Sequence, residues 1–188
     1  MKIVISGASG LIGTQLAKHL ASHGHEVVRL VRRTPKSGEV QWNPAAGSLD
    51  AAALEGSDAV IHLSGAGIGD KRWTNAYRKE ILDSRTDVCE QWEAAAKPAV
   101  DAGVRTVFLR TGIVLTPKGG ALKKLLPLFK LGVGGKFGNG KQWQSWISID
   151  DEIGAIEHLL TANVSGAVNL TAPNPVTNAE LTKVLASV

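Results

Sequence analysis

The sequence has little cysteine and no long apolar run near its start. A single cysteine among 188 residues leaves no partner for a disulfide within the chain, which favours a reducing, cytoplasmic location. The first apolar stretch, residues 3–5, stops at a glycine turn, whereas a secretory leader needs about 7–15 apolar residues and a membrane span about 20. We therefore expect a cytoplasmic protein that is neither exported nor embedded in a membrane.

Basic residues are in modest excess and are never concentrated in one run. The net charge is +4, from 21 Lys and Arg against 17 Asp and Glu, and no run of five cations occurs. Nucleic-acid-binding segments usually gather positive charge into a patch or stripe. The scattered excess therefore favours an anionic small molecule over nucleic acid as the partner.

The first 31 residues carry the pattern of a strand, a helix and a second strand. Residues 3–5 are a β-branched run, apolar residues recur at helical spacing over 11–23, and 27–31 are again apolar. Such a unit has parallel strands and a right-handed crossover. Further strands are predicted at 40–42, 58–63, 106–110, 146–149 and 167–170, and helices at 121–131, 150–160 and 178–188, with Asp150 or Asp151 capping the second helix. This order predicts an α/β fold with a doubly wound parallel sheet, the Rossmann fold.

Three glycines follow the first strand at a fixed spacing, Gly7-x-x-Gly10-x-x-Gly13. In a dinucleotide-binding loop the first glycine makes the tight turn, the second admits the pyrophosphate and the third lets the helix pack against the strand. The helix N-terminus adds free N–H donors and a partial positive charge. A tight turn without a ligand is the alternative. We predict a phosphate-binding loop made by Gly7, Ser9, Gly10, Leu11, Ile12 and Gly13.

Two arginines, Arg32 and Arg33, follow the second strand. NAD-binding members of this fold place an Asp or Glu at that point, where it accepts a hydrogen bond from the ribose 2′-hydroxyl. A guanidinium instead matches a 2′-phosphate, which a carboxylate would repel. The alternative is a pair of solvated loop arginines. The pattern predicts NADP(H) rather than NAD(H) as the cofactor.

Two further segments are candidates for the cofactor site because they follow predicted strands. The small residues Ser64, Gly65 and Ala66 come after the strand that ends near Leu63, at the edge where open α/β sheets bind their ligands. We expect Leu63 to Ala66 to contact the adenine side of the cofactor, although a plain turn has the same composition. Thr111 ends a later strand and is the candidate neighbour of the nicotinamide.

At these residues the chain resembles the extended short-chain dehydrogenase/reductase superfamily, which contains the sugar-nucleotide epimerases. Later motifs narrow the resemblance to the NAD-dependent epimerase/dehydratase-like epimerase family of the SDR39U1-like group. These motifs include Leu109-Arg110-Thr111-Gly112, Leu131-Gly132-Val133-Gly134-Gly135, Gly138-Asn139-Gly140-Lys141-Gln142 and Ser145-Trp146-Ile147-Ser148-Ile149-Asp150-Asp151. The resemblance covers essentially the whole chain in order, and it implies nicotinamide-dependent chemistry on a small molecule.

The acid–base pair that the superfamily uses, Tyr-x-x-x-Lys, is absent from the sequence. The one tyrosine, Tyr77, is followed four residues later by Ile81. Residues 74–102 also form one nearly continuous helical pattern, which would be about 42 Å long and too long for a crossover in such a sheet. We therefore hypothesise that a strand and loop are missing between about 83 and 89, where the resemblance places a catalytic loop.

These observations predict an NADP-binding Rossmann domain over residues 1–131 and a small, truncated substrate-side region over 132–188. The first functional hypothesis is an NADP(H)-dependent oxidoreductase or epimerase-like enzyme acting on a hydroxyl- or carbonyl-bearing small molecule. The alternative is a non-catalytic NADP(H)-binding sensor or partner-binding protein. No catalytic residue is assigned. No metal site is predicted either, because the five histidines and one cysteine do not suggest a ligand set.

Overall fold

The computed structural model describes residues 1–43, 46–64 and 93–187. The chain divides into two compact units, and each unit combines segments that are distant in sequence. The first unit contains residues 1–64, 110–162 and 169–188, and the second contains 65–109 and 163–168. The predicted boundary between an NADP-binding domain over residues 1–131 and a substrate-side region over 132–188 is a functional one, and it stays a prediction.

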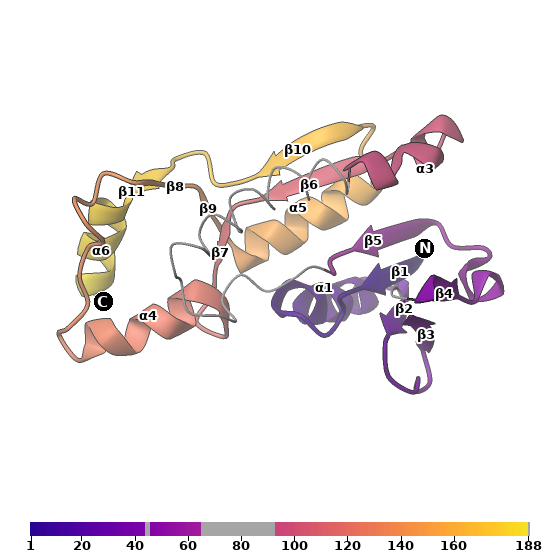
Figure 1. Ribbon diagram of the computed structural model, residues 1–188, viewed down its shortest axis with the longest axis horizontal. Helices are drawn as coiled ribbons and strands as arrows, with labels where there is room; N and C mark the ends of the chain where they lie inside the picture. The colour runs from indigo at the N-terminus through magenta and orange to yellow at the C-terminus, as the bar shows by residue number, and fades with distance from the viewer. Residues whose placement is uncertain (44–45, 65–92, 188) are drawn as a thin grey trace. The chain divides into compact units, whose positions relative to one another are not determined.

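A five-stranded sheet forms the N-terminal part of the first unit (Figure 1). Its strands, in chain order, are β1 (Lys2–Ser6), β2 (Glu26–Val31), β3 (Glu39–Asn43), β4 (Ser48–Leu49) and β5 (Ala59–His62). Their spatial order is β4-β3-β2-β1-β5. Strand β1 pairs in parallel with β2 and β5, and β2 pairs in parallel with β3, whereas β4 is antiparallel to β3. A short 3₁₀ helix, Ala51–Leu54, precedes β5.

Helix α1 (Leu11–Ser22) connects β1 to β2 and completes the predicted strand–helix–strand unit. The core of this unit is made by β1, since Ile3, Val4 and Ile5 have no exposed surface. Burying these side chains on both faces of a central strand explains their continuous apolar run. The buried residues of α1 are Gly13, Leu16, Ala17 and Leu20, a helical spacing that lays one stripe of the helix on the sheet. The described chain thus has a Rossmann-like α/β fold.

The rest of the first unit is built from short strands and three helices. These are β7 (Ile113–Leu115), α4 (Gly120–Lys130), β8 (Trp143–Gln144), β9 (Trp146–Ser148), α5 (Ile149–Thr161), β11 (Val176–Thr177) and α6 (Asn178–Ala186). Strand β7 is parallel to β9, and β8 is antiparallel to β11. Helix α5 packs against α1, which places the two helices side by side (Figure 1).

The described part of the second unit contains α3 (Lys97–Asp101) and the beginnings of two strands. Strands β6 (Val107–Thr111) and β10 (Gly166–Leu170) pair with each other, and both end in the first unit. At one end of this pair the Gly166 N–H donates to the Thr106 carbonyl, and at the other the Gly112 N–H donates to the Leu170 carbonyl.

The structure confirms the predicted strands and helices outside residues 65–92, with one correction at a helix start. Helix α5 is capped by Ser148, whose hydroxyl accepts a hydrogen bond from the Asp151 N–H at 3.0 Å. Asp150 and Asp151 instead lie in the first turn, where negative charge also favours a helix. The hypothesised gap between 83 and 89 lies outside the described residues. Among the described helices, none combines the length and apolarity that crossing a membrane requires.

Candidate functional site

In the glycine loop after β1, the backbone conformation and close packing require glycine at two of the three positions, Gly7 and Gly13. Gly7 has a φ of +71°, a conformation that L-residues with side chains rarely adopt. A Cβ on Gly7 would also lie 2.6 Å from the carbonyl carbon of Leu63. A Cβ on Gly13 would collide with the Gly7 carbonyl oxygen and lie 2.8 Å from the Ala8 Cα. Strand β1, the loop and helix α1 therefore approach one another too closely for a side chain at either position.

Gly10 differs from the other two glycines because the fold leaves it nearly open. A Cβ there would meet one described atom within 4 Å, the Gly7 carbonyl oxygen at 3.2 Å, which is a tight contact and not a collision. The Gly10 N–H donates to that same oxygen at 2.9 Å and closes the turn. The missing side chain at Gly10 leaves a surface on which a ligand can approach the backbone, as the second glycine of a dinucleotide loop requires.

The N-terminus of α1 is free of the groups that usually cover a helix start. Its N-cap, Gly10, has no side chain to accept a hydrogen bond, and no acidic residue lies in the first turn. The Thr14 N–H makes the first helical bond, to the Gly10 carbonyl. The N–H groups before Thr14 have no acceptor within the helix and lie at the positive end of its dipole. This end of α1 can therefore hold an anion.

The strand register brings two predicted segments to the same edge of the sheet as the glycine loop. Ser6, the last residue of β1, pairs with Leu30 of β2 on one side and with His62 of β5 on the other. Adjacent strands lie about 4.8 Å apart, so Arg32 and Leu63 leave the sheet beside the start of the loop. Ser64 follows directly, while the predicted Gly65 and Ala66 lie outside the described residues.

The two arginines after β2 have different surroundings. The Arg33 guanidinium forms a two-pronged ion pair with Glu39 of β3, with N–O distances of 2.8 and 2.7 Å. Arg33 also donates to the Thr34 carbonyl. The hydrogen bond from Arg33 is the main reason why the pKa of Glu39 is lowered, and the same pairing raises the pKa of Arg33. Sequence reasoning did not identify Glu39.

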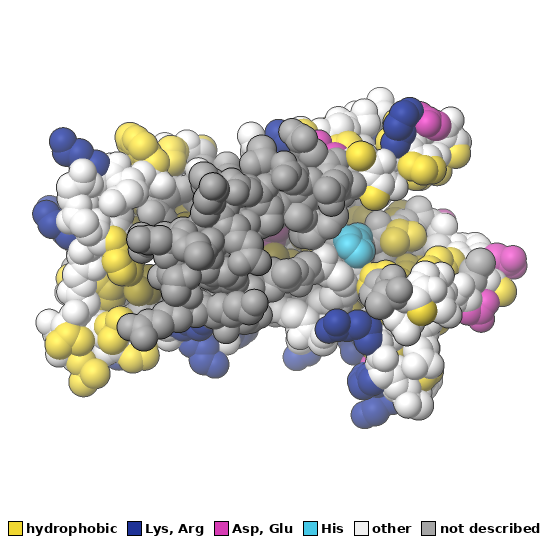
Figure 2. Space-filling view, in the orientation of Figure 1, with side chains coloured by type: hydrophobic (Ala, Val, Ile, Leu, Met, Phe, Trp, Pro, Cys, Tyr) yellow, Lys and Arg dark blue, Asp and Glu magenta, His cyan; other side chains and the backbone are white. Residues whose placement is uncertain are grey.

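Arg32 is exposed and makes no hydrogen bond or ion pair with the described residues. Figure 2 shows basic side chains gathered over the connection between β2 and β3, the segment that contains Arg32, Arg33 and Lys36. Since the Arg33 fork is occupied by Glu39, Arg32 is the arginine of the predicted pair whose guanidinium is available to a new anion.

Thr111, the predicted neighbour of the nicotinamide, donates its hydroxyl to Glu152 of α5 at 2.9 Å. Glu152 has no exposed surface, and its second carboxylate oxygen has no partner among the described residues. Burial raises the pKa of Glu152, and the hydrogen bond from Thr111 opposes this rise. The prediction missed Glu152, and the available signal was its place on the apolar stripe of α5 beside Ile149, Ile153 and Ile156.

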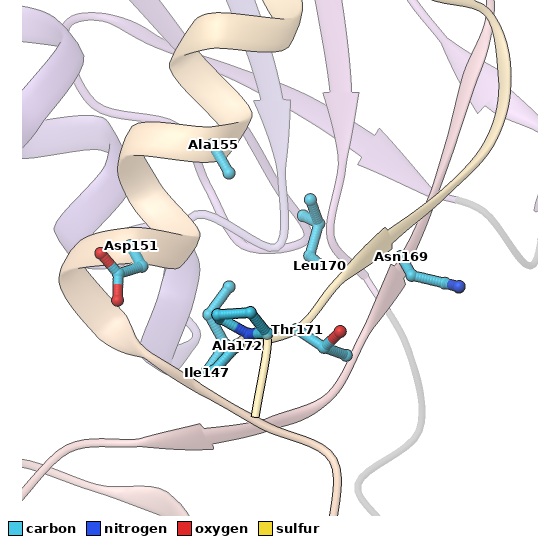
Figure 3. A pocket seen from close by; sticks show the side chains of 8 residues that line it. Ile147, Asp151, Ala155, Asn169, Leu170, Thr171 and Ala172 are labelled. Carbon is cyan, nitrogen blue, oxygen red and sulfur yellow. The ribbon is translucent and has the colours of Figure 1, made fainter. Parts of the chain in front are cut away.

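A hollow of about 330 Å³ lies elsewhere in the first unit (Figure 3). Asp151 and Ala155 line it from α5, and Asn169 to Pro173 line it from β10 and the turn that follows. The Asp151 carboxylate accepts a hydrogen bond from the Ser148 hydroxyl at 2.8 Å, so its role here is to fix the helix start. None of the described cofactor candidates lines this hollow.

Three histidines and a glutamate meet between α1 and α5. This group consists of His19, His23, His25 and Glu157. The sequence analysis judged that the five histidines and one cysteine form no ligand spacing, and the absence of a metal site stays a prediction. The available signal was the spacing of four residues between His19 and His23, which puts both side chains on one face of a helix.

Comparisons with known proteins agree with this architecture. Residues 3–125 match the NAD dependent epimerase/dehydratase family. An epimerase family protein of Mycobacterium tuberculosis is 37% identical over an alignment that covers 96% of this chain and 76% of the relative. The human epimerase family protein SDR39U1 is 32% identical, with 98% and 79% covered.

Two solved structures are similar to this protein over alignments that cover the whole chain. A nucleoside-diphosphate sugar epimerase from Corynebacterium glutamicum has a TM-score of 0.83 and 33% identity, and this chain covers half of its length. Human SDR39U1 isoform 2, crystallised with NADPH, has a TM-score of 0.79 and 29% identity, and 79% of it is covered.

The mycobacterial alignment is also longer than the matched part of this chain. It extends over 229 positions, whereas 96% of 188 residues is about 180 residues. About 49 aligned positions of the relative therefore have no counterpart here. Together, the family match over residues 3–125 and the identity to these relatives show that the chain belongs to the NAD dependent epimerase/dehydratase family.

Proposed function

We propose that this chain binds NADP(H) and acts as an oxidoreductase or epimerase-like enzyme on a small substrate with a hydroxyl or carbonyl group. The observation that carries the proposal is the sheet edge shared by the glycine loop after β1 and Arg32 after β2. These two features match the two anionic parts of the cofactor, the pyrophosphate and the 2′-phosphate. The human relative crystallised with NADPH supports the same choice.

The residues present fit this cofactor in chemistry and position. We assign the pyrophosphate to the loop formed by Gly7, Ser9, Gly10, Leu11, Ile12 and Gly13, because Gly10 admits a ligand to the backbone and the first turn of α1 carries free N–H groups. Leu63 and Ser64, with Gly65 and Ala66, are assigned to the adenine side and Thr111 to the nicotinamide side. When bound, the nicotinamide supplies or accepts a hydride, and the protein binds and orients it.

The two arginines have separate roles in this proposal. Arg32 binds the 2′-phosphate, since its guanidinium is exposed and makes no pair with the described residues. Arg33 positions the loop instead, because Glu39 occupies both of its terminal nitrogens. The Lys36 N–H also donates to Glu39 at 2.8 Å. Glu39 thus ties both ends of the segment 33–36 to strand β3.

A non-catalytic NADP(H)-binding protein is the second candidate, and one sequence observation favours it. The chain contains no Tyr-x-x-x-Lys, because Ile81 stands four residues after Tyr77. The 49 or so positions that the mycobacterial relative has in addition support the hypothesis of a missing internal segment. If that segment lies between 83 and 89, where the long helical pattern places it, the family resemblance implies that the missing residues include catalytic groups.

Titration with reduced cofactors tests the binding proposal. Fluorescence of the reduced nicotinamide reports binding of NADPH and NADH to the purified chain at the same ionic strength. We expect saturable binding of NADPH with at least tenfold tighter affinity than NADH, since each charge-assisted hydrogen bond to a phosphate contributes about 1.5–3 kcal/mol. Equal affinities would refute the assignment of Arg32 to a 2′-phosphate.

Turnover assays with possible substrates distinguish the enzyme from the non-catalytic NADP(H)-binding protein. The Corynebacterium structure is that of a nucleoside-diphosphate sugar epimerase, so nucleoside-diphosphate sugars are the first compounds to supply. Turnover of the sugar or of the nicotinamide, followed by chromatography and by absorbance of NADPH, supports the enzyme. Binding of NADPH without any turnover supports the non-catalytic protein. Both candidates retain a cytoplasmic location and a small-molecule partner.

A further inference from the structure

The side chains of His19, His23 and Glu157 converge at the contact between α1 and α5. His19 Nε2 lies 2.9 Å from one carboxylate oxygen of Glu157, and His23 Nδ1 lies 2.6 Å from the other. The two imidazole rings are 4.1 Å apart, centroid to centroid. One ligand atom from each of the three residues lies within 4.8 Å of the other two.

Elementary helix geometry explains why this group forms. His19 and His23 are four residues apart, one near the end of α1 and the other at its C-cap, so they lie on one face. Glu157 occupies the facing side of α5, and α1 packs against α5. Gly24, with a φ of +83°, then reverses the chain. This turn brings His25 Nε2 to 3.9 Å from Glu157.

The hydrogen bonds of this group leave one buried polar atom beside it without a partner among the described residues. The imidazoles of His19 and His23 share the single carboxylate of Glu157, and their ring centroids are 4.1 Å apart. The Nδ1 atom of His25 is buried and has no partner among the described residues. A dication in the place of the two shared protons would instead use a lone pair from each imidazole and neutralise the Glu157 carboxylate.

We propose that His19, His23 and Glu157 bind a zinc-like transition-metal dication that links α1 to α5. Two imidazole nitrogens and one carboxylate oxygen are a donor set typical of Zn²⁺, with the fourth position open to water. Magnesium and calcium prefer all-oxygen sites and are not expected to compete. Tetrahedral zinc bonds of about 2.0–2.2 Å place donor atoms about 3.3–3.6 Å apart. The histidine–carboxylate contacts of 2.9 and 2.6 Å would therefore lengthen on binding, and donor atoms that lie up to 4.8 Å apart would move closer.

The site is accessible to an ion from solution. The side chains of His19, His23 and Glu157 are 32%, 50% and 27% exposed. Bound metal would fix the last turn of α1, whose first turn belongs to the glycine loop, against α5. The proposal concerns a separate site and does not depend on the identity of the cofactor.

Calorimetric titration of the chelator-treated chain with ZnCl₂ tests the proposal. We expect one zinc ion per chain, at least tenfold weaker binding in both His23→Ala and Glu157→Gln, and no saturable heat with MgCl₂. His158→Ala is the matched control, because His158 adjoins Glu157 in the same helix but is not part of the group. That variant should bind zinc within twofold of the unaltered chain.

Two further measurements keep the test independent of folding defects. Far-ultraviolet circular dichroism checks that each variant keeps its helices. In the unaltered chain, zinc should protect His19 and His23, but not His158, from diethyl pyrocarbonate, as peptide mass spectrometry will show. The proposal is wrong if zinc gives no saturable binding, if His23→Ala and Glu157→Gln bind as tightly as the control, or if zinc protects His158 equally.

Discussion

Replacing Arg32 with alanine is the sharpest perturbation of the proposed cofactor site. The change removes the exposed guanidinium beside the glycine loop and leaves the Arg33–Glu39 ion pair intact. A hydrogen bond to a charged group contributes about 1.5–3 kcal/mol. The exposed position of Arg32 favours the lower half of that range. Because about 1.4 kcal/mol is a factor of ten, we expect the Kd for NADPH to rise about 10- to 40-fold.

The same variant should leave NADH binding within about twofold, because NADH has no 2′-phosphate for Arg32 to contact. Fluorescence titration of both cofactors at fixed salt measures the two constants. Arg33→Ala should weaken NADPH binding less, since the Arg33 fork is held by Glu39. Lys183→Ala, which removes a positive charge on α6, is the matched control. An unchanged NADPH affinity in Arg32→Ala, or a larger loss in Arg33→Ala, would refute the division of roles.

Three further predictions concern the fold around the site. Gly13→Ala should lower the free energy of unfolding by about 1–3 kcal/mol and weaken NADPH binding, because its Cβ would collide with the Gly7 carbonyl; denaturant unfolding that matches the unaltered chain would contradict the close approach. Ser148→Ala should cost about 1 kcal/mol in the same assay through loss of the helix cap, and an unchanged midpoint would count against that cap. Burial raises the pKa of Glu152 above its value in the unfolded chain, so the unfolded state loses its proton first and stability falls as pH rises from the unfolded pKa to the folded one. Glu152→Gln should lack this fall in pH-dependent thermal unfolding, and parallel pH profiles for the two proteins would contradict the raised pKa.

Much of the N-terminal fold could be predicted because its physical causes are local in sequence. A strand buried on both faces must be apolar throughout, which residues 3–5 show directly. The turn at Gly7 and the close packing at Gly13 need glycine for steric reasons, so their spacing was visible in the sequence. The start of α5 was misjudged by two or three residues, because Ser148, Asp150 and Asp151 are all acceptable helix caps.

The side-chain partners were not predictable, because the folded chain brings together residues that are distant in sequence. Thr111 and Glu152 are 41 residues apart, and His19 and Glu157 are 138 apart. Neither pair leaves a local pattern. The pairing of Arg33 with Glu39 spans only six residues, but it depends on β3 lying beside β2. Because that strand pairing is not visible in the sequence, the sequence analysis assigned both Arg32 and Arg33 to the 2′-phosphate.

A crystal structure of the chain with NADP⁺ tests the central claim most directly, through the distance between the 2′-phosphate and the Arg32 guanidinium. The account predicts an N–O distance of about 2.7–3.2 Å, with the pyrophosphate on the backbone N–H groups of the glycine loop and Arg33 still paired with Glu39. A 2′-phosphate that contacts solvent alone, or a pyrophosphate bound away from residues 7–13, would contradict it.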